Sequence, residues 1–181
     1  MLKKARGPQP YLETYSQEWR AGAQAIGYRE AAETLLDVVI ERERPTSRTL
    51  LHPILFLYRH SIELRLKRLI EEHGRDLAPP HHDIQSLYGA AKQAIQRFLP
   101  GTHFDPVDRV MDELHAIDPK SQTFRYATTP KGEPIEITVP EVDLVHLRMQ
   151  MDHLDTFFWG IEIEIDQAQE YAAEMTEHHG S

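Results

Sequence analysis

The sequence predicts an all-α protein, a bundle of about five helices with a small β-hairpin inserted before the long last helix. Three observations support this class. Apolar residues recur at three- and four-residue spacing along most of the chain, which is the period of an amphipathic helix. Residues that start and stop helices separate these stretches. One segment, residues 123–139, has instead the β-branched and aromatic composition of strands, with proline and glycine at positions 130–132 for a turn.

Local signals set the expected ends of the helices. The second helix has two candidate starts, either Thr49 or Pro53 with His52 as its N-cap, because proline is well tolerated in the first helical turn. Asp83 and Asp105 are good N-caps for the third and fourth helices. The helices are therefore expected at about 14–44, 49–74, 83–99, 105–118 and 140–175.

The chain has the size and composition of one globular domain. Its 181 residues are 40% hydrophobic, which is enough for one core and too few for two. We expect this domain to span residues 13–177, between a flexible arm at 1–12 and a disordered tail at 178–181. The sequence contains no apolar stretch that fits a signal peptide or a membrane span, so we expect a cytoplasmic protein that does not bind membranes.

The charge is unevenly distributed. The formal net charge is -9, and residues 141–177 contain ten acidic side chains but only one basic side chain, Arg148. This balance argues against indiscriminate phosphate binding and against sequence-specific binding to DNA. A local basic cluster nevertheless lies between positions 56 and 70, where only Glu63 opposes four cations, namely Arg59, Arg65, Lys67 and Arg68.

The residue types available limit the chemistry. The sequence has no cysteine, which excludes disulfides, thiolate metal sites and a cysteine nucleophile. His81, His82 and Asp83 could supply zinc ligands, but capping of the third helix explains Asp83 better. Phosphate-binding glycine loops and dinucleotide fingerprints are absent from the sequence. We therefore expect neither a metal nor a cofactor.

A charged stripe interrupts the second helix, "PILFLYRHSIELRLKRLIEEHG" at residues 53–74. On a helical wheel Arg59, His60, Glu63 and Lys67 share one arc of about 100°, while the other sides are apolar. Arg59, Glu63 and Lys67 follow one another at four-residue spacing, as a ladder of opposite charges.

Three interpretations of this stripe remain open. The ladder can face water, where each pair contributes a few tenths of a kcal/mol. The stripe can line a groove between helices or protomers, where Glu63 positions Arg59 and Lys67 to bind an anion. It can also form a buried structural network.

Four segments together resemble the HEPN superfamily of small helical proteins, over roughly residues 19 to 165. The resemblance implies a helical bundle that commonly forms homodimers and belongs to bacterial toxin–antitoxin or anti-phage defence systems. Active members are metal-independent endoribonucleases with an arginine and a histidine, four to six residues apart, at a dimer cleft. There arginine would stabilise the phosphorane charge and histidine would move a proton. The segments are "FLYRHSIELRLKRLIEEHG", "HHDIQSLY", "SQTFRYATTPKGEPI" and "DTFFWGIE".

The sequence offers several arginine and histidine candidates for this role. Arg59 and His60 are the first choice, since a polar residue follows the arginine as in the superfamily. Two pairs at the expected spacing are weaker, because an apolar residue follows each arginine. These pairs are Arg68 with His73 and Arg148 with His153. The residues expected to bind RNA or a partner are Glu63, Lys67, His82 and Arg125.

Two classes of function therefore stay open. The chain is expected to be a HEPN-like component of a bacterial defence or toxin–antitoxin system, either an endoribonuclease or a non-catalytic module that binds RNA or a partner protein. Phe157, Phe158 and Trp159 cover three faces of the last helix. At least one of them should therefore contact something beyond the core, and a homodimer interface is the simplest candidate.

Overall fold

The computed structural model describes residues 17–42, 47–77, 83–119, 124–126, 128, 131–135 and 142–179. Within these ranges the chain forms five α-helices and no extended strand, which confirms the predicted helical class. The helices are α1 (Gln17–Arg42), α2 (Ser47–His73), α3 (Ile84–Phe98), α4 (Asp105–Ile117) and α5 (Leu144–His179), with a short 3-10 helix, η1 (Arg75–Leu77), after α2.

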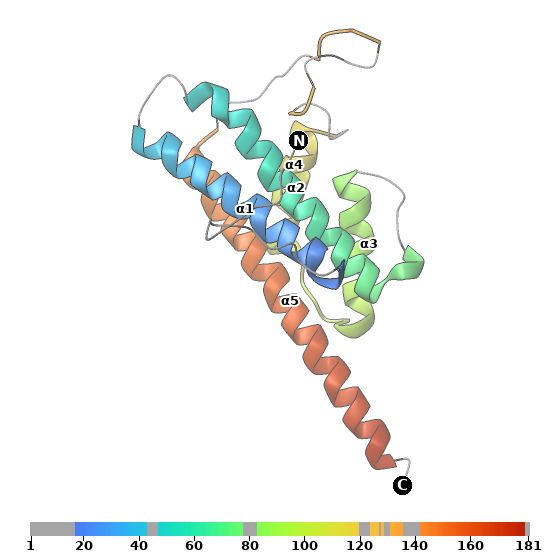
Figure 1. The fold of residues 1–181 in the computed structure, drawn as a ribbon. Helices are drawn as coiled ribbons and strands as arrows, with labels where there is room; N and C mark the ends of the chain where they lie inside the picture. Colours follow the sequence, from blue (N-terminus) through green and yellow to red (C-terminus); the bar gives the residue numbers. More distant parts are fainter. Residues whose placement is uncertain are drawn as a thin grey trace, which may run out of the picture.

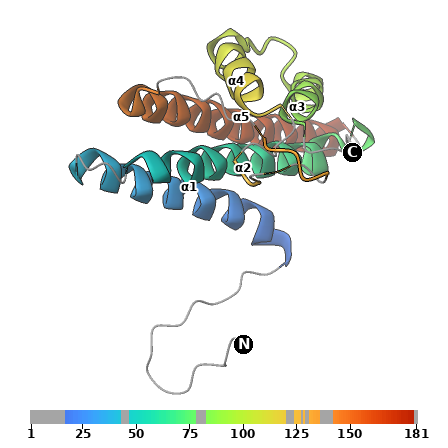
Figure 2. The same ribbon diagram turned by 90° about the horizontal axis from the view of Figure 1, so that it is seen from above.

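Helix α2 lies at the centre of the bundle. Helices α1 and α2 run side by side as an antiparallel pair (Figure 1). Helix α5 lies beside α2 when the bundle is seen from above (Figure 2), and ion pairs of Arg65 join the two helices. Seen from above, α3 and α4 form a further layer over α2 and α5, on the side away from α1 (Figure 2). The C-terminal part of α5 projects beyond the bundle (Figure 1), and its residues 169–176 are exposed.

The core combines apolar side chains from all five helices. Burying them removes apolar surface from water, which is the main favourable contribution to folding. Among the described residues, no helix combines the length and the apolar composition that a membrane crossing needs. The largest buried apolar side chains are Leu36, Ile54, Leu55, Tyr58, Leu66, Leu69, Ile84, Leu87, Ile95, Met111 and Phe158.

The start of α2 differs from one of the two expected starts. The helix begins at Ser47, so Pro53 lies inside it rather than at its first position, and the start at Pro53 is wrong. Leu50, which precedes the proline, packs against the core. This contact favours helical structure on the N-terminal side of Pro53, whose own side chain is exposed.

Aspartate caps define two other helix starts. Asp83 caps α3 as predicted, and its carboxylate accepts hydrogen bonds from the backbone N–H groups of Gln85 and Ser86. Asp143 caps α5 in the same way, so this helix begins after the predicted start near Pro140. Helix α5 also continues to His179, past the predicted end at Met175 and into the segment expected to be a tail.

The cap of α4 differs from the prediction by one residue. Phe104 is the N-cap, and Asp105 is the first helical residue rather than the cap. Phe104 is buried against the rings of Tyr88 and Phe157. This packing fixes the start of the helix more strongly than the capping preference of the next side chain.

Part of the predicted hairpin lies outside the described residues, and so do the N-terminal arm and His82. In the described part of residues 123–139, Thr128 and Pro134 form one antiparallel bridge. Gly132 between them has a φ of 81°, which side chains other than glycine rarely adopt.

Substituting Asp83 tests how much its side-chain cap stabilises the start of α3. Asp83→Ala should lower the free energy of unfolding by about 1 kcal/mol, while Asp83→Asn should lower it by less than about 0.5 kcal/mol, because asparagine also caps. Urea unfolding at neutral pH measures both. Equal losses for the two variants would show that the charge, rather than the cap, stabilises the helix.

The pH dependence of this cap follows from the Asp83 pKa. Burial acts to raise this pKa, but hydrogen bonds from Ser86 and Gln85 outweigh it and hold the pKa below its ordinary value. The charged cap therefore stabilises the protein above the unfolded-state pKa of about 3.9, and this contribution is lost as the pH falls through the folded-state pKa. The difference in the free energy of unfolding between the wild type and Asp83→Ala should therefore become smaller as the pH falls through the folded-state pKa of Asp83.

Candidate functional site

The charged stripe of α2 is largely buried. Arg59 is 2% exposed and Glu63 is 1% exposed, and Arg59 Nη1 lies 3.3 Å from Glu63 Oε2. Lys67 Nζ lies 2.8 Å from the other carboxylate oxygen of Glu63, and its side chain is 39% exposed. Glu63 therefore holds both cations, as expected, but a ladder that faces water throughout is ruled out.

A second carboxylate completes a buried charge cluster around Arg59, which we define as Arg59, Glu63 and Asp118. Asp118 follows the end of α4 and is also buried. Burial lowers the pKa of Arg59, while the negative charges of Asp118 and Glu63 oppose this shift and the nearby Arg125 adds to it. Two carboxylates around one guanidinium keep the arginine charged despite its burial.

Aromatic rings enclose His60, the second catalytic candidate. Its imidazole stacks on Phe56 with ring centroids 5.5 Å apart, and the edge of Tyr28 from α1 packs against it at 4.5 Å. The guanidinium carbon of Arg125 lies 5.6 Å from the centroid of the same Phe56 ring, within the range of a cation–π contact. Arg125 is exposed, whereas His60 is partly buried.

The segment before the predicted turn thus lies on α2. Phe124 packs on His52 with ring centroids 5.8 Å apart, one turn before the contact between Arg125 and Phe56. Arg125, one of the expected binding residues, therefore lies close to His60 and the charged stripe. His82, the remaining binding candidate, lies outside the described residues.

The first spaced pair, Arg68 with His73, has a carboxylate between its two side chains. Arg68 donates to Glu72 at 2.9 Å, one turn further along α2. His73 packs against the ring of Phe98 at 5.4 Å and lies 3.4 Å from the side chain of Gln169. The two side chains share one neighbour, Glu72, whose second carboxylate oxygen lies 3.9 Å from His73 Nε2. This carboxylate occupies the place between them where a phosphate would have to bind.

In the second spaced pair, Arg148 with His153, carboxylates likewise bind the arginine. Arg148 forms ion pairs with two carboxylates of α1, Glu33 at 3.0 Å and Asp37 at 2.5 Å. These contacts fasten the start of α5 to α1. His153 is exposed on α5. Among the described residues, no group of three or more histidine and carboxylate side chains could hold a metal ion.

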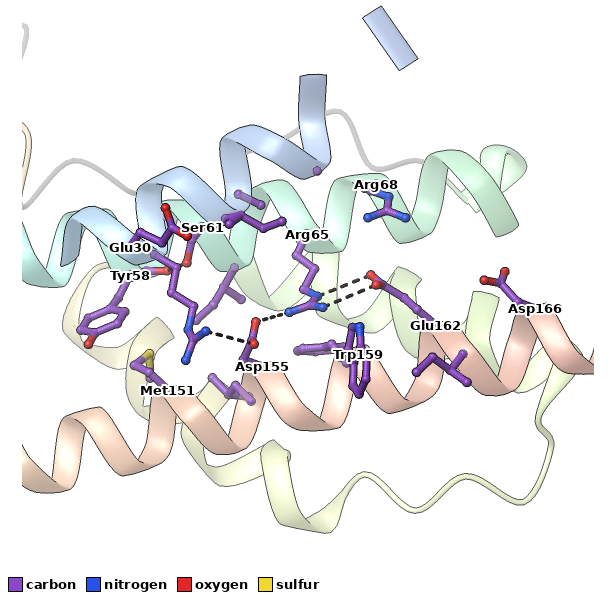
Figure 3. Close-up of a pocket in the computed structure, with 18 residues that line it drawn as sticks. Glu30, Tyr58, Ser61, Arg65, Arg68, Met151, Asp155, Trp159, Glu162 and Asp166 are labelled. Atoms are coloured by element: carbon purple, nitrogen blue, oxygen red, sulfur yellow. Dashed lines mark hydrogen bonds and ion pairs between the residues drawn. The ribbon is translucent and has the colours of Figure 1, made fainter. Parts of the chain in front are cut away.

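The structure adds a groove that the sequence did not indicate. It lies between α1, α2 and α5 and encloses about 440 Å³. Figure 3 shows Arg65 of α2 directed at Asp155 and Glu162 of α5, with Trp159 beside them. Arg29 of α1 binds Asp155 and also Asp152.

This groove explains part of the basic cluster expected in α2. The sequence places Arg65 in this cluster, and in the structure two carboxylates of α5 neutralise it. The seven-residue spacing of Asp155 and Glu162, which places both on one side of a helix, was the signal available in the sequence. This spacing alone did not identify the partners of the two carboxylates, Arg29 of α1 and Arg65 of α2.

Comparisons with known proteins add no family. Neither a family model, nor a curated protein, nor a solved structure matches this chain. The resemblance to the HEPN superfamily therefore stays a prediction from the quoted segments.

Comparing a buried with an exposed arginine tests the role of the cluster. Arg59→Ala leaves Glu63 and Asp118 buried with less compensation, so it should lower the free energy of unfolding by about 3–5 kcal/mol. Arg109→Ala is the matched control, since Arg109 pairs with Glu113 at the same four-residue spacing but on the surface. Its expected effect is below about 0.5 kcal/mol. Urea unfolding measures both, and a similar small loss for the two would contradict a structural role for Arg59.

Proposed function

We propose that this protein is a HEPN-like component of a bacterial defence or toxin–antitoxin system, and that it acts in the cytoplasm as a non-catalytic binding module. One observation carries the choice between the two classes. Arg59 is buried, pairs with Glu63 and feels the charge of the buried Asp118, whereas an arginine that stabilises a phosphorane must contact the substrate phosphate. The resemblance of the four segments and the helical bundle support the family part of the proposal.

The other arginine candidates support the same choice. Arg68 and Arg148 have carboxylate partners close by, on α2 and α1. A phosphate would have to displace these carboxylates before it could bind either guanidinium. Their ion pairs are explained by the packing of the bundle, so no reaction is needed to account for them.

The proposal includes a homodimer, as the resemblance implies. Val145 and Met149 are exposed and lie one turn apart on α5, so they offer neighbouring apolar side chains. It also retains the hairpin at residues 123–139, which the bridge between Thr128 and Pro134 and the positive φ of Gly132 support.

A ribonuclease is the second candidate, because His60 and Arg125 both pack on the ring of Phe56. Arg125 is exposed. In this version Arg125, rather than the buried Arg59, would stabilise charge on the phosphate, and His60 would move the proton. RNA or a partner protein remains the proposed ligand in both versions.

An RNA cleavage assay separates the two candidates. The purified chain, incubated with labelled single-stranded RNAs in EDTA, should produce no more fragments than buffer alone. His60→Ala and Arg125→Ala should behave identically to the wild type. Metal-independent cleavage that is lost in both variants, but retained in the exposed control Lys131→Ala, would replace the binding module with the ribonuclease.

Light scattering tests the homodimer. The wild type should have twice the chain mass of 21.0 kDa at micromolar concentration. Met149→Glu should weaken the dimer by about tenfold or more, because burying a carboxylate in an apolar contact is unfavourable. Met175→Glu, in the projecting part of α5, is the matched control and should leave the mass unchanged. A wild-type monomer throughout this range would contradict the proposed assembly.

A further inference from the structure

The groove between α1, α2 and α5 has an apolar surface that the bundle leaves uncovered. Ile26 of α1 is 60% exposed and Trp159 of α5 is 61% exposed, and both line the groove. Ile163 lies one turn beyond Trp159 and lines it as well. Large apolar side chains that face one groove from two helices are typical of a contact with another molecule.

The internal ion pairs neutralise the cations of this groove. Arg29 and Arg65 share Asp155, and each has one further carboxylate partner, Asp152 or Glu162. Arg68, at one end, pairs with Glu72. An incoming anion would therefore have to compete with carboxylates that are already in place.

Negative charge remains at the rim. Glu30 and Asp166 line the groove and are exposed, and within the described part of the chain neither forms an ion pair. Counting the lining residues and their ion-pair partners among the described residues gives six carboxylates against three arginines. The carboxylates are Glu30, Glu72, Asp152, Asp155, Glu162 and Asp166. The groove thus presents apolar surface with an acidic rim.

We propose that this groove binds an amphipathic helix with a basic polar face, supplied by a partner protein. Its apolar side chains would cover Ile26 and Trp159, while lysine or arginine side chains would meet Glu30 and Asp166. A cation can also lie over the exposed ring of Trp159. The inference names a partner class for the proposed binding module and so rests on that proposal.

The dimensions and the charge of the groove support this occupant. On α5 it extends from Met151 to Asp166, which at 1.5 Å per residue is about 22 Å, or roughly four helical turns. The α5 helix of a second copy is a poorer match for this groove, because its residues 151–177 are strongly acidic and would bring like charges against the rim.

A designed peptide serves as the probe. A fluorescently labelled 18-residue helix, with leucine along one face and lysine elsewhere, is titrated with the full chain and its anisotropy is measured. A second peptide with glutamate in place of lysine is the charge control. The lysine peptide should bind about tenfold more tightly than the glutamate peptide or better, and added salt should weaken it.

Matched variants of α5 locate the bound peptide. Trp159→Ala should weaken binding of the lysine peptide by about tenfold or more, whereas Tyr171→Ala, at a residue that is 65% exposed outside the groove, should change it by less than about twofold. Asp166→Lys should weaken it to a similar extent, while Glu164→Lys, which makes the same charge change at an exposed residue outside the groove, should not. Unchanged melting temperatures exclude loss of the fold.

Several outcomes would overturn the inference. Equal effects of Asp166→Lys and Glu164→Lys would indicate unspecific attraction to an acidic helix. If the lysine peptide does not bind, the inference is wrong. If in addition Trp159→Ala has the mass of a monomer in light scattering, the groove is the contact with a second copy. RNA cleavage is read separately, so a ribonuclease that still binds the peptide here would contradict the proposed function and leave this inference standing.

Discussion

The buried pair of Arg59 and Glu63 is the interaction on which the surroundings of α2 depend. A charge removed from water is strongly destabilising unless other charges and hydrogen bonds compensate it. Here part of the compensation comes from outside α2, because Asp118 at the end of α4 contributes a second negative charge near the guanidinium. The position of α4 and the path of the chain after it are therefore coupled to the central helix by electrostatics as well as by apolar packing.

The opposite side of α2 uses charges in a second way. The hydroxyl of Tyr58 donates to Glu33 of α1, and burial together with this carboxylate raises the tyrosine pKa far above its ordinary value. Arg65 joins α2 to α5 through Asp155 and Glu162. Part of the acidic excess of the C-terminal region thus neutralises arginines of the first two helices. The acidic excess of this region is therefore used partly in packing the helices, and only the remainder is charge on the surface.

Local signals predicted the helical class and the Asp83 cap, because both depend on residues close together in the sequence. These signals failed where contacts between residues far apart in the sequence determine the structure. Proline at position 53 suggested a helix start, yet the packing of Leu50 against the core extends α2 back to Ser47. The wheel placed Arg59 and Glu63 on one face correctly, but it could not show that Asp118 and the segment at 124–125 lie against that face. The groove combines residues from three separated helices, so no single pattern in the sequence indicated it.

These contacts separate the charges that support the fold from the groups available to a ligand. An arginine that serves catalysis must exchange its partners for substrate, and Arg59 would have to leave two carboxylates in a medium of low polarity to do so. Arg29 and Arg65 are likewise engaged in holding helices together. What remains accessible on α1 and α5 is an apolar surface bordered by carboxylates, with Trp159 at its centre. A surface of this kind offers shape and negative charge to a ligand and, within the described residues, no group placed to move a proton. This is why we propose binding rather than cleavage.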